Sequence, residues 1–158
     1  MSLPIHLRDA TPGDRDFLFQ VFAAAGPAME LQALPDSPLR AQLIQIQFQG
    51  WHTGYSTQYG TGGLKIIEES AVPCGYVWLA DQEGEQRIVD LAFAPAARGK
   101  GLGSTLVQSL VSAAHAAGKP MRASIAKSNG GSLRFNVRLG AIIASETPTH
   151  WAIEWPIR

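Results

Sequence analysis

Glycine stands at alternate positions where a β-rich run gives way to a helical one. The run "VDLAFA" cannot continue past Pro95 as a central strand, because proline has no N–H to donate to a neighbouring strand. Glycines follow at positions 99, 101 and 103, and apolar residues then recur at helical spacing over 102–111. This order predicts a strand, a glycine turn and a helix whose first amides lie beside backbone without side chains.

Two interpretations of this turn stay open on its residues alone. The first amides of a helix have no partner inside the helix and lie at the positive end of its dipole. Glycines leave these amides uncovered, so that a phosphate can contact the backbone directly, and Arg98, Lys100 and Ser104 add charge and a hydroxyl donor. A strand-to-helix turn that needs glycine only for its tight geometry has the same composition.

Two familiar phosphate-binding motifs do not fit. The P-loop needs a Gly-x-x-x-x-Gly-Lys-Ser/Thr string, which the chain lacks. The dinucleotide-binding fingerprint opens a βαβ unit and has an acidic residue about 20 positions later, whereas this turn follows a β-hairpin and no such acid follows it.

Capping residues and changes of hydrophobic period divide the rest of the chain. A cap followed by proline, at 11–12 and again at 37–38, predicts two helix starts, and the Gly-Pro pair at 26–27 predicts the end of the first helix and a loop after it. Pro73 separates the first two strands of the β-rich middle. The expected order is β-α-α-β-β-β-α-β-α-β-β. Strands are expected at 5–10, 63–70, 74–81, 86–94, 121–127, 141–146 and 150–157, with the last two helices after the glycine turn and within 128–140.

Charge and cysteine content exclude several classes of protein. Thirteen basic and thirteen acidic residues give a formal net charge of zero, which argues against a broad nucleic-acid-binding face. Cys74 is the sole cysteine and no His, Asp or Glu pair has metal-ligand spacing, so we expect neither a disulfide nor a metal. The first residues lack the features of a signal peptide, and no apolar run reaches the about 20 residues of a membrane helix. We therefore expect a cytoplasmic protein without a membrane partner.

Three motifs along the chain resemble motifs of the GNAT superfamily of N-acetyltransferases. The string "RGKGLG" at 98–103 is similar to that family's pyrophosphate signature, Arg/Gln-x-x-Gly-x-Gly/Ala. "VDLAFAP" at 89–95 resembles its central strand and bulge, and "NGGSLRFNVRLGA" at 129–141 resembles its N-x-x-A-x-x-L-Y-x-x-x-G-F helix. The resemblance implies an α/β (α+β) fold with a mixed, mostly antiparallel sheet of about seven strands and about four helices, and residues 1–158 as a single acetyltransferase domain.

The resemblance also implies that acetyl-CoA is the co-substrate. In the family the pantetheine arm pairs with the backbone of the central strand, and the turn amides hold the pyrophosphate. The asparagine that opens the later helix helps to hold the pantetheine, although here it caps a helix equally well. The residues expected to bind CoA are Leu91, Ala92, Phe93, Arg98, Gly99, Lys100, Gly101, Leu102, Gly103, Ser104 and Asn129.

The implied reaction moves an acetyl group from a thioester to an amine, so it needs a base and a leaving thiol. A carboxylate commonly takes the proton of the amine, and Asp90 and Glu68 are the candidates because the central sheet borders the family's cleft. Some members use a glutamate at the position that is Arg87 here. The tyrosine that often protonates the thiolate is replaced by Asn136, whose amide can donate a hydrogen bond but not a proton.

The resemblance implies that the acceptor of the acetyl group is a small-molecule amine or a protein amine. The family binds its acceptor between the first two helices and the last hairpin, which implies roles for Glu30, His52, Tyr55 and Trp151; core packing explains the helical spacing of the aromatic residues equally well. The tryptophan-rich strand at the C-terminus is a candidate edge for a homodimer. Two other functions stay open: an acyl-CoA-binding sensor with little catalysis, and a phosphate binder that does not use CoA.

Overall fold

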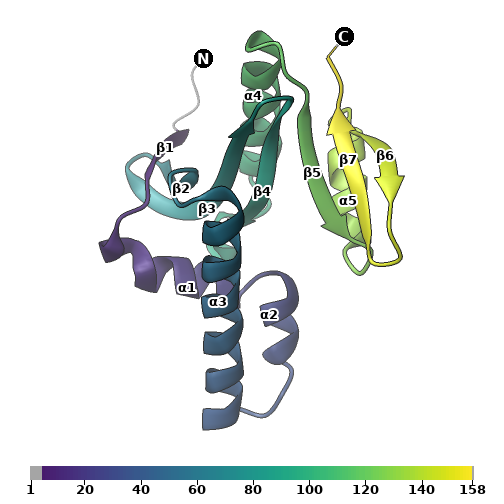
Figure 1. Ribbon diagram of the computed structural model, residues 1–158. Coiled ribbons are helices and arrows are strands. Elements are labelled where there is room, and N and C mark those ends of the chain that lie inside the picture. Colours follow the sequence, from purple (N-terminus) through teal and green to yellow (C-terminus); the bar gives the residue numbers. More distant parts are fainter. Residues whose placement is uncertain (1–4, 158) are drawn as a thin grey trace. The chain divides into compact units, whose positions relative to one another are not determined.

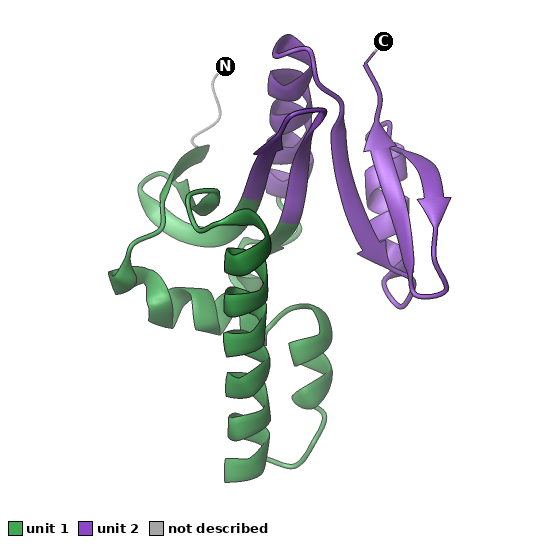
Figure 2. Cartoon of the chain, viewed as in Figure 1, with its two compact units in different colours: residues 1–78, 90–100 green, residues 79–89, 101–158 purple. Residues whose placement is uncertain are grey.

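The computed structural model describes residues 5–157, whose helices and strands are drawn in Figure 1. The chain divides into two compact units (Figure 2). Unit 1 combines the described residues up to 78 with 90–100, and unit 2 combines 79–89 with those from 101 onward. The strands β3 (Val72–Gln82) and β4 (Glu85–Phe93) therefore contribute residues to both units.

Within residues 5–157, seven strands form one sheet in the order β1-β2-β3-β4-β5-β7-β6. The pair β4–β5 is parallel, and the pairs β1–β2, β2–β3, β5–β7 and β6–β7 are antiparallel. This confirms the predicted mixed, mostly antiparallel sheet. The strands are β1 (Ile5–Asp9), β2 (Leu64–Glu69), β3 (Val72–Gln82), β4 (Glu85–Phe93), β5 (Met121–Ala126), β6 (Ile142–Glu146) and β7 (His150–Trp155).

The described residues contain five α-helices, one more than the sequence predicts. The additional helix is α2 (Gly26–Leu31), in a segment predicted to be a loop. Gly26 has a φ of 53°, which breaks the chain away from the preceding helix, and Pro27 fits a first helical turn because its fixed φ and missing N–H cost nothing there. The others are α1 (Arg15–Ala23), α3 (Pro38–Tyr59), α4 (Leu102–Ala116) and α5 (Gly130–Arg138), with 3₁₀ turns η1 (Pro12–Asp14) and η2 (Pro95–Ala97).

Strand β3 includes Pro73, which the sequence predicts as a separator. The turn lies just before the strand, at Ser70 and Ala71, whose φ values are 51° and 68°. The register of β2 on β3 shifts after Ile67, and Pro73 then pairs with Glu68. Because proline lacks an N–H, it is tolerated where a ladder is irregular, so here it marks a bulge and not a strand end.

The core of unit 1 is aromatic and is centred on Trp51 of α3. The centroid of its ring lies 5.4 Å from that of Phe22, 5.6 Å from Phe48, 5.1 Å from Tyr76 and 5.2 Å from Trp78. Rings at these separations contribute buried area, and the Tyr76 and Trp78 rings meet Trp51 edge-to-face, which adds attraction. The aromatic series that the sequence places along one face of α3 therefore packs helix against sheet.

The tryptophan-rich strand β7 lies inside the sheet of unit 2. It pairs with β5 on one side and with β6 on the other. A strand with two neighbours has no free row of backbone groups, so the expectation that this strand forms the edge of a homodimer is wrong. The edge strands are β1 and, next to β7, β6, whose Ile142 is 50% exposed.

The start of the first helical segment is held by an ion pair that also reaches β2. Both oxygens of Asp14 accept hydrogen bonds of 2.9 Å from Arg8, and Oδ2 also accepts one of 2.7 Å from the Thr11 N–H. Arg8 donates a further bond of 2.9 Å to Glu68. The bonds from Arg8 are the main cause that lowers the pKa of Asp14 to about 2, against the opposing effect of burial.

We expect this pair to make stability depend on pH. The pKa of Asp14 is lower in the folded chain, about 2 against an ordinary value of 3.8, so its contribution is present above about pH 4 and is lost as the pH falls through 2. Asp14→Asn should lower the free energy of unfolding by about 1–2 kcal/mol near neutral pH, since Arg8 is partly exposed. Urea unfolding at about pH 7 and about pH 2.5 measures both values, and the gap between wild type and variant should narrow at the lower pH.

The matched control is Asp16→Asn, on an exposed residue in the first turn of α1, the helix that begins directly after Asp14. It should leave the free energy of unfolding within about 0.5 kcal/mol of wild type at both pH values. If the difference in free energy of unfolding between wild type and Asp14→Asn is the same at low pH, the ion pair of Asp14 is not the source of the pH dependence.

Candidate functional site

The glycine turn between β4 and α4 has the strand–turn–helix form that the sequence predicts. After Phe93 the chain forms η2, and Gly99 and Gly101 each have a φ of 77°, in the left-handed region that favours glycine. A Cβ added at either glycine would have no other atom within 4 Å. Any residue other than glycine would therefore be strained at these two positions, and no side chain covers the backbone there.

The first turn of α4 carries free donors. The first recorded bond runs from the Thr105 N–H to the Gly101 carbonyl, at 3.2 Å. Among residues 5–157, no acceptor is recorded for the amides of Leu102, Gly103 and Ser104, and no side chain caps the helix. These N–H groups lie at the positive end of a helix of 15 residues, where an anion is stabilised.

The two basic residues of the turn, both in unit 1, have different surroundings. Arg98 donates from Nε to the Phe93 carbonyl at 3.1 Å and from a terminal nitrogen to the Ala24 carbonyl at 2.8 Å. Lys100 is exposed, with its Nζ 3.8 Å from a carboxylate oxygen of Glu69. Arg98 thus ties the turn to the carbonyls of Phe93 and Ala24, and Lys100 is held only by a loose ion pair.

The end of β4 continues beyond its pairing with β5. Recorded pairs join Gln86–Ile88 of β4 to Met121–Ala123 of β5. Leu91, Ala92 and Phe93, the strand residues expected to bind CoA, lie after this paired part.

Asp90 immediately precedes these strand residues and accepts three hydrogen bonds within unit 1. Its Oδ2 accepts from the Trp51 Nε1 at 2.8 Å and from the Tyr76 hydroxyl at 2.9 Å, and its Oδ1 accepts from the Leu91 N–H at 2.9 Å. Burial raises the pKa of Asp90, and the three hydrogen bonds oppose that rise. Burial and, secondly, the charge of Asp90 raise the pKa of Tyr76 well above its ordinary value.

Glu68, the other candidate base, lies in a different setting. Its side chain is 17% exposed and accepts from Arg8, in the ion-pair network that holds the start of the first helical segment. It shares no recorded hydrogen-bond partner with Asp90. The structure thus gives Asp90 aromatic partners next to β4, and it gives Glu68 a basic partner on β1.

Two asparagines of α5 make bonds to their own helix. Asn129 caps the helix by accepting from the Ser132 N–H at 3.1 Å. Asn136, at the position of the family's tyrosine, donates from Nδ2 to the Ser132 carbonyl at 2.9 Å. Both side chains are therefore engaged in stabilising the helix.

The four candidate acceptor-binding residues are divided between the two units, three in unit 1 and one in unit 2. His52 and Tyr55 lie on α3 beside Trp78, with ring centroids 5.8 and 5.6 Å from it. Burial is the largest cause that raises the pKa of Tyr55. Glu30 is exposed on α2, and Trp151 is half-buried on β7 in unit 2.

The sequence did not identify the partners of Asp90. Trp51 and Tyr76 are 39 and 14 residues away along the chain, on a helix and on another strand. The only signal available was that a buried tryptophan or tyrosine needs a partner for its polar atom.

No group of three or more His, Cys, Asp or Glu residues within 5–157 is placed to hold a metal ion. In the same range, no helix is long and apolar enough to cross a bilayer.

Comparison with known proteins gives a consistent result. The family model for the acetyltransferase (GNAT) domain matches residues 5–142. The PaiA N-acetyltransferase of Thermoplasma acidophilum, solved with coenzyme A, superposes with a TM-score of 0.69 at 14% identity, covering 98% of each chain. The ribosomal-protein-S18-alanine N-acetyltransferase of Escherichia coli gives 0.66 at 14% identity, over 97% of this chain and 94% of that one.

A third structure, Arabidopsis thaliana Naa50 with the bisubstrate analogue CoA-Ac-MVNAL, gives a TM-score of 0.60 at 13% identity, over 96% and 98% of the two chains. A search of curated proteins gave no match. At these identities the solved structures establish the fold, and the family model, which spans most of the sequence, establishes the relationship. The chain therefore belongs to the GNAT acetyltransferase family and is an acyltransferase.

Proposed function

We propose that the protein is an acetyl-CoA-dependent N-acetyltransferase that moves the acetyl group to a primary amine by direct attack in a ternary complex. The observation that carries this is the uncovered first turn of α4, placed directly after β4 in a chain of the GNAT family. Acetyl-CoA supplies an activated thioester and brings a pyrophosphate that needs such donors. We treat residues 1–158 as one acetyltransferase domain.

The residues around the turn fit this co-substrate. The unpartnered amides of Leu102, Gly103 and Ser104 suit the pyrophosphate, and Arg98 and Lys100 provide positive charge before them. Backbone groups of 91–93, beyond the pairing of β4 with β5, are available to an extended pantetheine arm. Asn129 has a role as a helix cap already and is the least supported of the expected CoA-binding residues.

Asp90 is the residue we assign as general base. A free amine with a pKa near about 10.4 must lose a proton before it can attack. A carboxylate with a raised pKa takes a proton more readily, and burial among aromatic rings raises the pKa of Asp90. Trp51 and Tyr76 hold the carboxylate in place, so they act as positioning residues.

Neither Tyr76 nor Asn136 is suited to protonate the leaving thiolate. The hydroxyl of Tyr76 is bonded to Asp90 and its pKa is raised, which makes it a weak acid. Asn136 has no acidic proton. A thiol with a pKa of about 8.5 can leave as a thiolate without a proton donor, but more slowly than with one. We therefore expect slow turnover.

The acceptor is a small-molecule or protein amine. Support for a protein amine comes from two structural neighbours, one described as an S18-alanine N-acetyltransferase and one bound to a peptide-containing bisubstrate analogue. The second candidate function is an acyl-CoA-binding sensor with little catalysis, which the asparagine at position 136 favours.

Gly101→Ala should weaken binding of acetyl-CoA at least about tenfold, because a Cβ at this left-handed position shifts the first amides of α4. Isothermal calorimetry measures the Kd. Gly118→Ala is the matched control: Gly118 also has a φ of 77° and open space around its Cβ, but it follows the other end of α4. Equal losses of affinity in the two variants would show that strain, and not the site, is responsible.

Asp90→Asn should lower turnover by about 100-fold or more and remove the acidic limb of the pH–rate profile, with acetyl-CoA affinity kept. The limb reflects protonation of the base, so activity falls as the pH decreases through a pKa above the ordinary 3.8. Tyr76→Phe loosens the same carboxylate but should retain the limb. If Asp90→Asn keeps the acidic limb of the pH–rate profile and Glu68→Gln loses it, the general base is Glu68 and not Asp90.

Asn136→Tyr should raise turnover, by about tenfold or more, if the missing phenol limits departure of the thiolate. The measurement is thiol release from acetyl-CoA across a panel of amines. Unchanged or lower turnover in Asn136→Tyr would contradict the proposal that the asparagine at this position slows departure of the thiolate. Wild type that binds acetyl-CoA but releases no thiol with any amine favours the sensor.

A further inference from the structure

Gly75 lies on β3 beside the end of β4, and both belong to unit 1 (Figure 2). The residue is buried, and a Cβ added to it would lie 2.5 Å from the carbonyl oxygen of Ala92 and 3.1 Å from the Cα of Phe93. The φ of Gly75 is outside the left-handed region, so the glycine is explained by lack of space and not by backbone conformation. The end of β4 therefore follows a path that any side chain at position 75 would obstruct.

The Ala92 carbonyl sets the direction of the next N–H. No cis peptide bond is recorded within 5–157, and in a trans peptide the C=O and the following N–H point in opposite directions. Because the Ala92 oxygen lies against Gly75, the Phe93 N–H points away from β3. The next peptide is held in register by the Ala94 N–H, which donates to the Cys74 carbonyl of β3 at 2.8 Å.

The edge of β4 that faces away from β3 has few backbone groups left for a ligand. Recorded pairing of β4 with β5 ends at Ile88, and by the alternation of a strand Leu91 and Phe93 face this edge. The Leu91 N–H already donates to Asp90 Oδ1 at 2.9 Å, and the Phe93 carbonyl already accepts from Arg98 Nε at 3.1 Å. Among these four groups, the Phe93 N–H and the Leu91 carbonyl are the pair that remains for a bound molecule.

We propose that Gly75 is a positioning residue for the pantetheine arm of acetyl-CoA. Because it has no side chain, the peptide between Ala92 and Phe93 turns its N–H toward the edge of β4 where the arm binds. The Phe93 N–H then donates to an amide carbonyl of the arm, and the Leu91 carbonyl accepts from an amide N–H. The inference rests on the proposed function, which assigns the arm to residues 91–93.

Gly75 acts on the arm and not on the pyrophosphate. The three atoms nearest to the added Cβ belong to Ala92 and Phe93, and none belongs to residues 99–104 of the glycine turn. A substitution at this position should therefore affect one end of the co-substrate and spare the other. General loosening of the fold would affect both ends.

Gly75→Ala tests the proposal with two probes, acetyl-CoA and adenosine 3′-phosphate 5′-diphosphate, which is the nucleotide end without the arm. The variant should bind acetyl-CoA at least about fivefold more weakly, the effect of about one hydrogen bond, and should bind the nucleotide within about twofold of wild type. Isothermal calorimetry measures both Kd values. The matched control is Gly62→Ala, also in unit 1, where the φ is not left-handed and a Cβ would have no atom within 4 Å. It should change neither Kd.

A measurement on wild type tests the direction of the Phe93 N–H without a substitution at Gly75. The chain has six phenylalanines, so labelling with ¹⁵N-phenylalanine gives a simple spectrum, and Phe93→Leu identifies the Phe93 cross-peak by its absence. Acetyl-CoA should move the Phe93 amide proton downfield, saturably and further than the nucleotide does. If acetyl-CoA moves it no further than the nucleotide, the proposal is overturned, whether or not Gly75→Ala folds.

The two probes also separate this inference from the proposed function. Equal weakening of both probes in Gly75→Ala, or weakening of neither, overturns the role of Gly75 and leaves the proposed function standing. If acetyl-CoA binds wild type no more tightly than the nucleotide, no arm lies along β4, and the proposed function fails together with this inference.

Discussion

The carboxylate of Asp90 is the interaction on which unit 1 depends most. It collects donors from helix α3, from strand β3 and from the backbone of β4, and so ties three elements together at one point. An unsatisfied buried carboxylate is costly, which means that Trp51 and Tyr76 cannot move independently of it. The next three residues of β4 are those assigned to the pantetheine arm. A group that fixes the core is therefore adjacent to the proposed chemistry, and its two roles share one cause: burial raises its pKa, and the same burial demands the partners that hold it.

Local signals predicted most of the fold, and they failed where one residue type has two meanings. Ser37 before Pro38 predicted the start of α3, and its hydroxyl does accept from the Arg40 N–H. The Gly-Pro pair at 26–27 was interpreted only as a helix end, although proline is equally suited to begin the next helix. Pro73 was interpreted as a break, although β3 accommodates it at a bulge. Whether proline stops or starts an element is decided by the neighbouring strand or helix, which one sequence does not reveal.

The features of the candidate site also differ in how far the sequence alone predicts them. The free amides of α4 were predictable because they follow from chain-local properties: glycine, a helix start and no capping side chain. The surroundings of Asp90 were not, because Trp51 and Tyr76 are brought to it by tertiary packing. Asn129 and Asn136 show a third case, in which the residue is in the expected helix but its amide bonds to that helix. For asparagine, helix support and ligand contact use the same atoms, so sequence cannot rank them.

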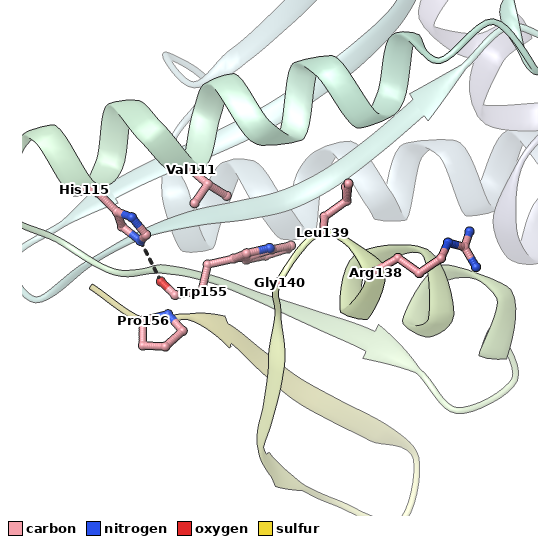
Figure 3. A pocket seen from close by; sticks show the side chains of 7 residues that line it. All are labelled: Val111, His115, Arg138, Leu139, Gly140, Trp155 and Pro156. Carbon is pink, nitrogen blue, oxygen red and sulfur yellow. Dashed lines mark hydrogen bonds between the residues drawn. The ribbon is translucent and has the colours of Figure 1, made fainter. Parts of the chain in front are cut away.

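The tryptophans show how the fold distributes the cost of buried polar groups. Trp51 and Trp78 each bury a large ring and still place the N–H on an oxygen, so packing and hydrogen bonding are compatible in this protein. Trp155 is 3% exposed, yet within residues 5–157 its N–H has no recorded acceptor, while its own carbonyl accepts from His115 (Figure 3). Packing and hydrogen bonding are therefore not matched at every tryptophan. Where the chain brings an oxygen to the indole, as it does at Trp51 and Trp78, the N–H is satisfied, and at Trp155 the cost of the unmet donor stays within the folded chain.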